Sequence, residues 1–214
     1  HIKIESEKAK INRPVDFKKA ENTFSKAVSK YKDMFLEVGL VDPLPEKAPV
    51  PDDLAIRTKD IKGAAYFLDA AQVGICEMFD NAWYKDSSPL NHKYAIVIVV
   101  RPGRTPEIDN LSFNWVSGYE IDAAQLRAVE IAIAVSEHIQ WMGFNAKAHD
   151  YSKGDIDISR LSVIAGLNVR DGDDLINPFL GNKYAIAAVT TDYELNIDEP
   201  LSSSAKNGRG IGYW

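Results

Sequence analysis

The pattern of apolar and polar positions predicts an amphipathic helix near the start of the chain. From Phe17 to Val38, apolar residues recur at three- and four-residue spacing, which is the period of one helix face. Gly39 follows the last of them and is expected to end the helix. The residues of the expected apolar face are Phe24, Val28, Tyr31, Phe35 and Val38.

Two longer helical patterns and one short pattern follow. The first is expected to begin with Thr58 as its N-cap and to end near Gly74. The second runs from about residue 122 to residue 142, is interpreted as nearly all apolar, and is expected to end at Gly143 as its C-cap. The short one begins at Asp155 or Asp157, whose carboxylate would cap a helix that closes at Gly166.

Strands are predicted where apolar residues run without interruption. The run 94–100 is apolar at every position, which is typical of a central strand covered on both faces. Shorter strands are predicted at 75–78 and 144–148. Residues 175–176 and 184–189 are expected to pair as a hairpin with a long loop. Because helical and strand patterns alternate, the fold class is α/β (or α+β), with a mixed sheet flanked by helices.

The remaining segments suggest how the chain is divided. Residues 1–55 are expected to form an N-terminal arm that is extended over residues 1–16, a helix, and a linker stiffened by four prolines. Residues 56–201 would form the α/β core. Residues 202–214 are rich in Ser and Gly and are expected to be a flexible tail or the start of a linker.

Charge and cysteine content exclude several functions. The net charge of −6 argues against a general nucleic-acid binder, because the chain has no excess of Lys and Arg to neutralise phosphates. No apolar stretch is long enough to span a bilayer. Cys76 is the single cysteine, so this chain cannot itself ligate an iron–sulfur cluster or form an internal disulfide. Cys76 lies in an apolar run and is interpreted as a small buried side chain.

Few residues suggest chemistry directly. His138 lies on the long helix among apolar residues and is interpreted as a core histidine, whereas His149 ends a strand, where polar groups often reach a pocket. The acidic segments 155–157 and 171–174 lack the spacing of a calcium loop and are interpreted as caps and turns. Aromatic residues gather where they could either wall a pocket or cap the sheet: Trp83, Tyr84, Phe113, Trp115 and Tyr119.

Several short blocks resemble reductive dehalogenases, and they occur in the order found in that family. The block from Val15 to Ala27 resembles an early family block that ends Asn-Thr-Phe-Ser-Arg-Ala. The resemblance extends over roughly residues 15–201. The other matching blocks are Ala70–Ile75, Lys93–Val100, Gly118–Glu120, Trp141–Ala146, Ala165–Leu167, Val189–Asp192 and Asp198–Leu201.

The resemblance implies a nitroreductase-like fold, shared with epoxyqueuosine reductases and cobalamin-processing proteins. It also implies cobalamin as the cofactor of a working member of the family. Tyr119 matches the Gly-Tyr block that bears the family's proton-donating tyrosine. A phenol acts as that acid only beside a basic partner that lowers its pKa, and the sequence identifies no such partner.

Three departures from the family pattern point away from catalysis. After Ala165-Gly-Leu167, the family continues with a glycine-rich, basic loop, but here residues 168–174 are one residue shorter and acidic. Arg170 is the one basic residue there, at a shifted position. Secondly, the two cysteine-rich motifs that bind the family's iron–sulfur clusters have no counterpart in this sequence. Thirdly, residues 150–157 are more polar than the loop that the family has at this position. Reduction of cobalt would therefore need an outside electron source.

These observations leave three functional hypotheses. The first is a non-catalytic module, without cofactor, that packs against or supports the catalytic half of the same polypeptide in a fused, self-sufficient reductive dehalogenase. The second is a working cobalamin-dependent domain that receives electrons from a separate iron–sulfur partner, with Tyr119 as its acid. The third is a stand-alone flavin- or cobalamin-binding protein of the same fold. By resemblance to the self-sufficient enzymes, a cytoplasmic location is expected.

Overall fold

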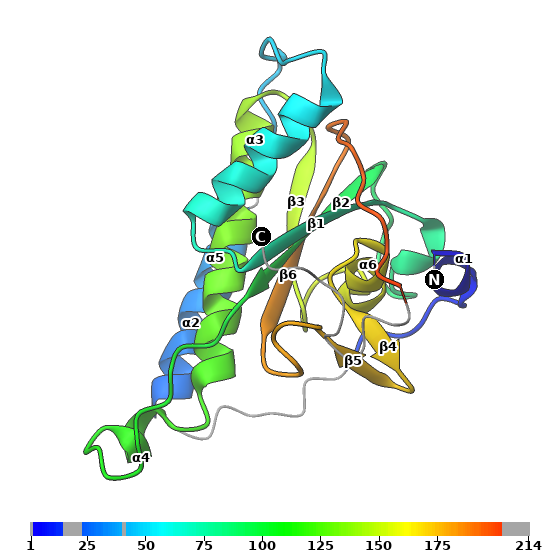
Figure 1. Ribbon diagram of the computed structural model, residues 1–214. Coiled ribbons are helices and arrows are strands. Elements are labelled where there is room, and N and C mark those ends of the chain that lie inside the picture. Colours follow the sequence, from blue (N-terminus) through cyan, green and yellow to red (C-terminus); the bar gives the residue numbers. More distant parts are fainter. Residues whose placement is uncertain (1, 15–22, 40–41, 203–214) are drawn as a thin grey trace.

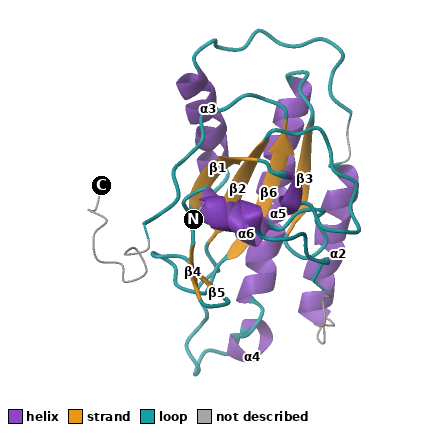
Figure 2. Cartoon of the chain, turned by 90° about the vertical axis from the view of Figure 1, so that its right-hand side faces the viewer, coloured by secondary structure: helices purple, strands orange, loops and turns teal. Residues whose placement is uncertain are grey.

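A four-stranded sheet with helices on both faces organises the molecule, and Figures 1 and 2 show the two layers of helices. The computed structural model describes residues 2–14, 23–39 and 42–202. The strand order is β1 (Gln72–Glu77), β2 (Tyr94–Val100), β6 (Ala185–Thr191) and β3 (Ala146–Asp150). The helices are α1 (Ile2–Glu7), α2 (Thr23–Val38), α3 (Leu54–Phe67), a 3-10 turn (Asp80–Ala82), α4 (Phe113–Val116), α5 (Glu120–Trp141) and α6 (Ile158–Ile164).

The α/β class is confirmed, but the expected mixture of parallel and antiparallel pairs is wrong for the sheet. β2 pairs antiparallel with both β1 and β6, and β3 also pairs antiparallel with β6. The long crossover through α5 does make β3 parallel to β2. However, β6 lies between them, so these two parallel strands are not neighbours.

The sheet separates two apolar cores, as the uninterrupted apolar run of β2 predicted. Ile96 and Ile98 face the core beneath α3 and α5, whereas Val97 and Val99 face the core beneath α6. All four side chains are fully buried. Because successive side chains of a strand point to opposite faces, a strand covered on both sides must be apolar throughout.

The hairpin expected between residues 175–176 and 184–189 is absent from the described sheet pairings. Instead β5 (Asp174–Ile176) pairs with β4 (Val169–Asp171) in a separate two-stranded ribbon. The turn between them is at Gly172, whose φ of +62° lies in the left-handed region that favours glycine. The Asp-Gly turn brings β4 and β5 together as a local hairpin, and β6 pairs with β2 and β3 in the main sheet.

The second predicted helix is displaced toward the N-terminus. Asp53, not Thr58, is the N-cap of α3, and its carboxylate accepts a hydrogen bond of 2.8 Å from the Ala55 amide. Thr58 lies inside the helix, and its hydroxyl accepts from the Asn196 amide. The helix ends at Phe67, so Gly74 is a residue of β1. The expected end at Gly74 was therefore wrong.

The N-terminal arm is not extended throughout, because α1 is a helix. It lies beside α6 and the 3-10 turn, on the opposite side of the sheet from α3 and α5 (Figure 1). Glu5 of α1 is buried although it is charged. A buried carboxylate of this kind needs ion-pair partners, and here one comes from the arm itself, Lys8, and the other from β4, Arg170.

Other expected features agree with the structure. α5 ends before Gly143, which has a φ of +83°, and Asp157 caps α6 by accepting from the Arg160 amide. Residues 42–50 form no helix or strand, as their prolines predicted. No helix in the described part of the chain is long and apolar enough to cross a membrane. The expected tail lies outside the described residues, apart from Ser202.

Candidate functional site

Tyr119 lies directly before α5, at the base of the projecting loop that carries α4 (Figure 1). It is half-buried, and no hydrogen bond joins its hydroxyl to a described residue. The neighbouring charge is the carboxylate of Glu120, which accepts from the Gly118 amide and the Thr105 hydroxyl. The hydrogen bond from Thr105 lowers the pKa of Glu120, so the group stays anionic.

The five aromatic residues do not form a single wall. Trp83 and Tyr84 are buried on the α6 side of the sheet, where the Trp83 backbone forms a bridge with Ile156. Phe113 and Trp115 belong to α4, and Trp115 is 72% exposed. The pocket-wall interpretation is therefore not supported, because the two groups lie on separate parts of the fold.

The acidic segment that replaces the family's glycine-rich loop forms the ribbon of β4 and β5. Arg170 is in β4, and its Nε donates to the Glu5 carboxylate at 3.1 Å. Lys8 donates to the same oxygen at 2.7 Å. Burial alone would raise the pKa of Glu5, but these two cations hold it below its usual value. The one basic residue of this segment is thus directed to α1.

Two buried asparagines fill the space behind this ribbon. The Asn177 amide nitrogen donates to the backbone oxygen of Leu167 at 3.0 Å and to the side-chain oxygen of Asn168 at 3.2 Å. Asn168 in turn donates to the Ser162 hydroxyl at 2.9 Å. Both asparagines are fully buried. Their polar atoms are satisfied within the protein, so they hold α6 and β5 together instead of facing a ligand.

Arg160 anchors the N-terminal arm, and sequence analysis did not single it out. Its guanidinium is 3% exposed and forms an ion pair with Asp157 at 3.1 Å. Its other nitrogens donate to the backbone oxygens of Lys8, Ala9 and Asn81 at 2.7 to 3.1 Å. A basic residue inside an otherwise apolar helix was the only available signal.

His149 is the inner end of a short chain of hydrogen bonds. The Asp155 amide donates to its Nδ1 at 3.3 Å, which leaves Nε2 to donate to the Thr190 hydroxyl at 2.9 Å. That hydroxyl then donates to Nδ1 of His92 at 2.7 Å. Trp83 packs edge-on against the buried imidazole. Burial lowers the pKa of both His149 and His92, so both imidazoles are neutral near pH 7.

We expect the stability of the fold to fall when the pH drops below about 6.5, because of His149. The unfolded chain binds a proton there, whereas the folded chain keeps this imidazole neutral. The free energy of unfolding should therefore decrease by about 1.4 kcal/mol per pH unit through His149. His92, whose pKa burial also lowers, adds to this slope. Urea unfolding between pH 7 and about pH 5, above the range where carboxylates titrate, measures this slope.

His149→Gln should remove the part of that slope that His149 contributes, whereas the part from His92 remains. The matched control is His138→Gln, because His138 is exposed on α5. The interpretation of His138 as a core histidine was therefore wrong. The control should keep the slope of the original protein. An unchanged slope in His149→Gln would contradict the assignment of the pH dependence to this buried imidazole.

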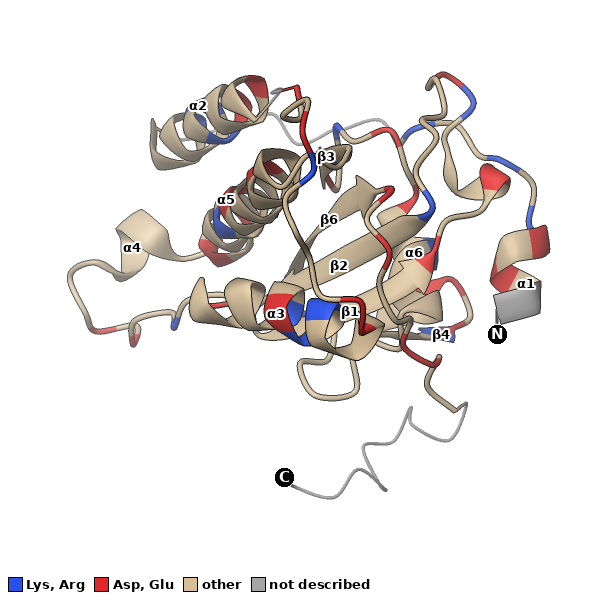
Figure 3. Cartoon of the chain, turned by 90° about the horizontal axis from the view of Figure 1, so that it is seen from above, with Lys and Arg blue, Asp and Glu red and all other residues tan. Residues whose placement is uncertain are grey.

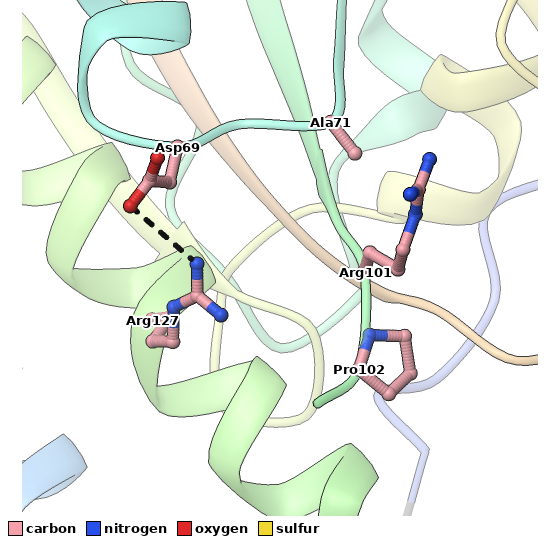
Figure 4. A pocket seen from close by; sticks show the side chains of 5 residues that line it. All are labelled: Asp69, Ala71, Arg101, Pro102 and Arg127. Atoms are coloured by element: carbon pink, nitrogen blue, oxygen red, sulfur yellow. Dashed lines mark ion pairs between the residues drawn. The ribbon is translucent and has the colours of Figure 1, made fainter. Parts of the chain in front are cut away.

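A further hollow of about 420 Å³ lies where the end of β2 meets the start of β1. Figure 4 shows its lining residues Asp69, Ala71, Arg101, Pro102 and Arg127. Arg127 approaches Asp69 at 3.9 Å, and Arg101 points away from Arg127 (Figure 4). The two guanidinium groups therefore do not converge on a common ligand position.

The remaining candidates are structural. Cys76 is buried, and burial raises the pKa of its thiol, as expected for a small core side chain. No group of three or more His, Cys, Asp or Glu side chains suited to a metal occurs among the described residues. Asp155 pairs with Lys147 at 2.7 Å and with Arg13 at 3.2 Å.

No protein-family model matches the chain, and no curated protein matches it. Among solved structures, the chain is similar to the catabolic reductive dehalogenase NpRdhA, with a TM-score of 0.79 and 34% sequence identity. The same values apply to NpRdhA in complex with 3-bromo-4-hydroxybenzoic acid. The match covers 91% of this chain but only 28% of NpRdhA. The expected resemblance to reductive dehalogenases is thereby confirmed.

A weaker similarity supports the fold alone. The epoxyqueuosine reductase from Bacillus subtilis matches with a TM-score of 0.53 and 12% identity, over 71% of this chain and 49% of that protein. At such low identity the comparison says nothing about shared chemistry.

Proposed function

Since this chain shares the reductive dehalogenase fold, we propose that it is a non-catalytic module of such an enzyme. In this proposal it packs against, or supports, the part of the enzyme that holds cobalamin and the iron–sulfur clusters. The chain spans 28% of the length of NpRdhA, which leaves most of that enzyme's length for the catalytic parts.

The observation that carries the proposal is the ion pair between Arg170 and Glu5. A catalytic domain of the family needs a basic residue near its cofactor to stabilise a departing halide. Here Arg170 is held 3.1 Å from a buried carboxylate of α1, and the adjoining turn contributes Asp171, Asp173 and Asp174. The field at this edge of the fold is therefore negative and would oppose a halide anion.

The surroundings of Tyr119 support the same proposal. A tyrosine that donates a proton is helped by a nearby cation, which stabilises the phenolate. Among the described residues, no basic group forms a hydrogen bond with the Tyr119 hydroxyl. We therefore propose no proton-transfer role for it in this chain.

The residues around β4 and β5 do not fit a corrin ring. Approach of such a flat ring requires glycine backbone or small side chains, as the family's glycine-rich loop would provide. In this chain the space behind the ribbon is filled by Asn168 and Asn177, which bond to one another and to their neighbours. We derive no reaction step through cobalamin for this reason.

Titration of the purified chain with cob(II)alamin tests the proposal, with a flavin titration alongside. We expect no saturable change in the absorption spectrum with either compound, because no described cradle suits them. The measurement detects binding itself and does not depend on a reaction.

A stoichiometric change with cobalamin would contradict the proposal and favour the second hypothesis, a working domain supplied with electrons by a partner. Tyr119→Phe would then become the informative variant. A change with flavin alone would favour the third hypothesis.

A further inference from the structure

The apolar residues of α2 are not confined to the face that packs on the protein. The helix contacts α5 and β3, and the residues it buries there are Ser25 and Val28. Ser29 and Lys32 lie half-buried on the same side, and Lys32 reaches the Asp150 carboxylate at 3.2 Å. Phe35 and Leu36 are half-buried on this side as well, so the inner face mixes polar and apolar residues.

A second apolar stripe lies on the flank of the helix. Its members follow one another at intervals of three, four, three and four residues, and this heptad spacing is the signature of helix-on-helix packing. On an α-helix this stripe is rotated by roughly a third of a turn from the buried face. Its members are Phe24, Ala27, Tyr31, Met34 and Val38.

These side chains are exposed in the isolated chain. Tyr31 is 53% exposed and Val38 is 61% exposed, while Phe24 and Met34 are each more than two-fifths exposed. Figure 3 shows α2 at the outer edge of the molecule, with α5 on its inner side. Contiguous exposed apolar side chains of this kind mark an interaction surface.

We propose that the stripe of α2 is a self-association surface, where the same stripe of a second copy packs antiparallel to it. Two identical surfaces related by a two-fold axis form the commonest kind of homodimer interface. The proposal concerns pairing of this chain with itself, and it does not depend on the proposed module function.

The charged residues beside the stripe select this arrangement. Lys30 and Glu37 are exposed on the same flank, and neither has an ion-pair partner among the described residues. In an antiparallel pair these flanks face each other. With Tyr31 opposite Met34 of the second copy, Lys30 comes within about two residues, or roughly 3 Å along the axis, of Glu37 of the second copy. Symmetry creates this attraction twice.

Other arrangements lack that complementarity. A parallel pair would place Lys30 opposite Phe35, which has no charge. An antiparallel pair shifted by one heptad, with Tyr31 opposite Ala27, would bring the two Lys30 side chains together. Charge therefore favours one orientation and one register.

Sedimentation-velocity measurements over a dilution series of the purified chain test the proposal. We expect a monomer–dimer equilibrium. Met34→Lys should weaken the dimer about a hundredfold, because the substitution introduces two buried charges per interface. Lys30→Glu and Glu37→Lys should each weaken it about tenfold by replacing attraction with repulsion. The double variant Lys30→Glu/Glu37→Lys should recover nearly the original dissociation constant.

Leu111→Lys is the matched control, since Leu111 is 95% exposed in the loop before α4, away from the stripe. It should leave the dimer unchanged. Circular dichroism establishes that each variant is folded. A monomer at every concentration would overturn the proposal and leave the stripe to a different partner. A dimer that withstands Met34→Lys, or a charge-exchanged double variant no better than its parents, would overturn it equally.

Discussion

Replacing Arg160 with methionine is expected to lower the free energy of unfolding by about 3–5 kcal/mol. The guanidinium is buried and holds Asp157 together with three backbone oxygens of the arm and the 3-10 turn. Methionine fills similar space, yet it leaves the buried carboxylate without its partner. Urea denaturation followed by circular dichroism measures the loss.

Arg127→Met is the matched control, because Arg127 is exposed and only approaches an exposed Asp69 at 3.9 Å. Its effect should stay within about 0.5 kcal/mol. Equal losses in the two variants would contradict the role given to Arg160. The Arg160 variant should also release the arm, and hydrogen exchange of the α1 amides would report this separately.

Gly74→Ala is expected to destabilise the fold by about 3 kcal/mol or more, through overpacking between β1 and α6. A Cβ atom at this position would overlap the backbone oxygen of Ala165 and would come within 2.9 Å of the Leu167 side chain. Both neighbours are buried, so neither can move aside cheaply. Thermal unfolding would register the change as a large drop in Tm.

Gly63→Ala makes the same chemical change at a site with the opposite expectation. Gly63 is exposed within α3, and a Cβ there would meet nothing within 4 Å. Alanine should stabilise the protein by about 0.5–1 kcal/mol, because it restricts the unfolded chain and favours the helix. If both alanine variants changed stability alike, the close approach at Gly74 would not be the cause.

The buried elements could be predicted from the sequence because their patterns depend on local periodicity. β2 is apolar at every position because it is covered on both faces, and α5 keeps a helical run of apolar residues because it packs on the sheet. Such patterns need no knowledge of the rest of the chain. The same holds for Gly143 and Asp157, whose roles at helix ends follow from backbone chemistry.

Features that depend on distant partners could not be predicted in this way. The strand at residues 174–176 pairs with whichever neighbour the whole topology supplies, and here this is β4 rather than β6. The polar groups behind the ribbon are a similar case. Asn168, Asn177 and Arg160 are ordinary loop and helix residues in the sequence, and only the fold buries them against one another.

The site residue chosen by resemblance illustrates a further limit. Tyr119 was identified from a two-residue block, which marks a position in the fold but does not describe the charges around it. Glu5 forms the ion pair with Arg170, and Thr105 forms the hydrogen bond with Glu120. Neither Glu5 nor Thr105 lies in a block that the resemblance marked as functional. A motif therefore locates a site more readily than it establishes its chemistry.

The position of β6 has a consequence for how the protein is made. This strand is the last of the six in the chain, yet it lies inside the sheet between β2 and β3. During translation, β3 therefore has no partner in this sheet until residues 185–191 have left the ribosome. The apolar faces of α5 and β2 stay exposed until then, so the core of this fold closes only after its last described strand has been made.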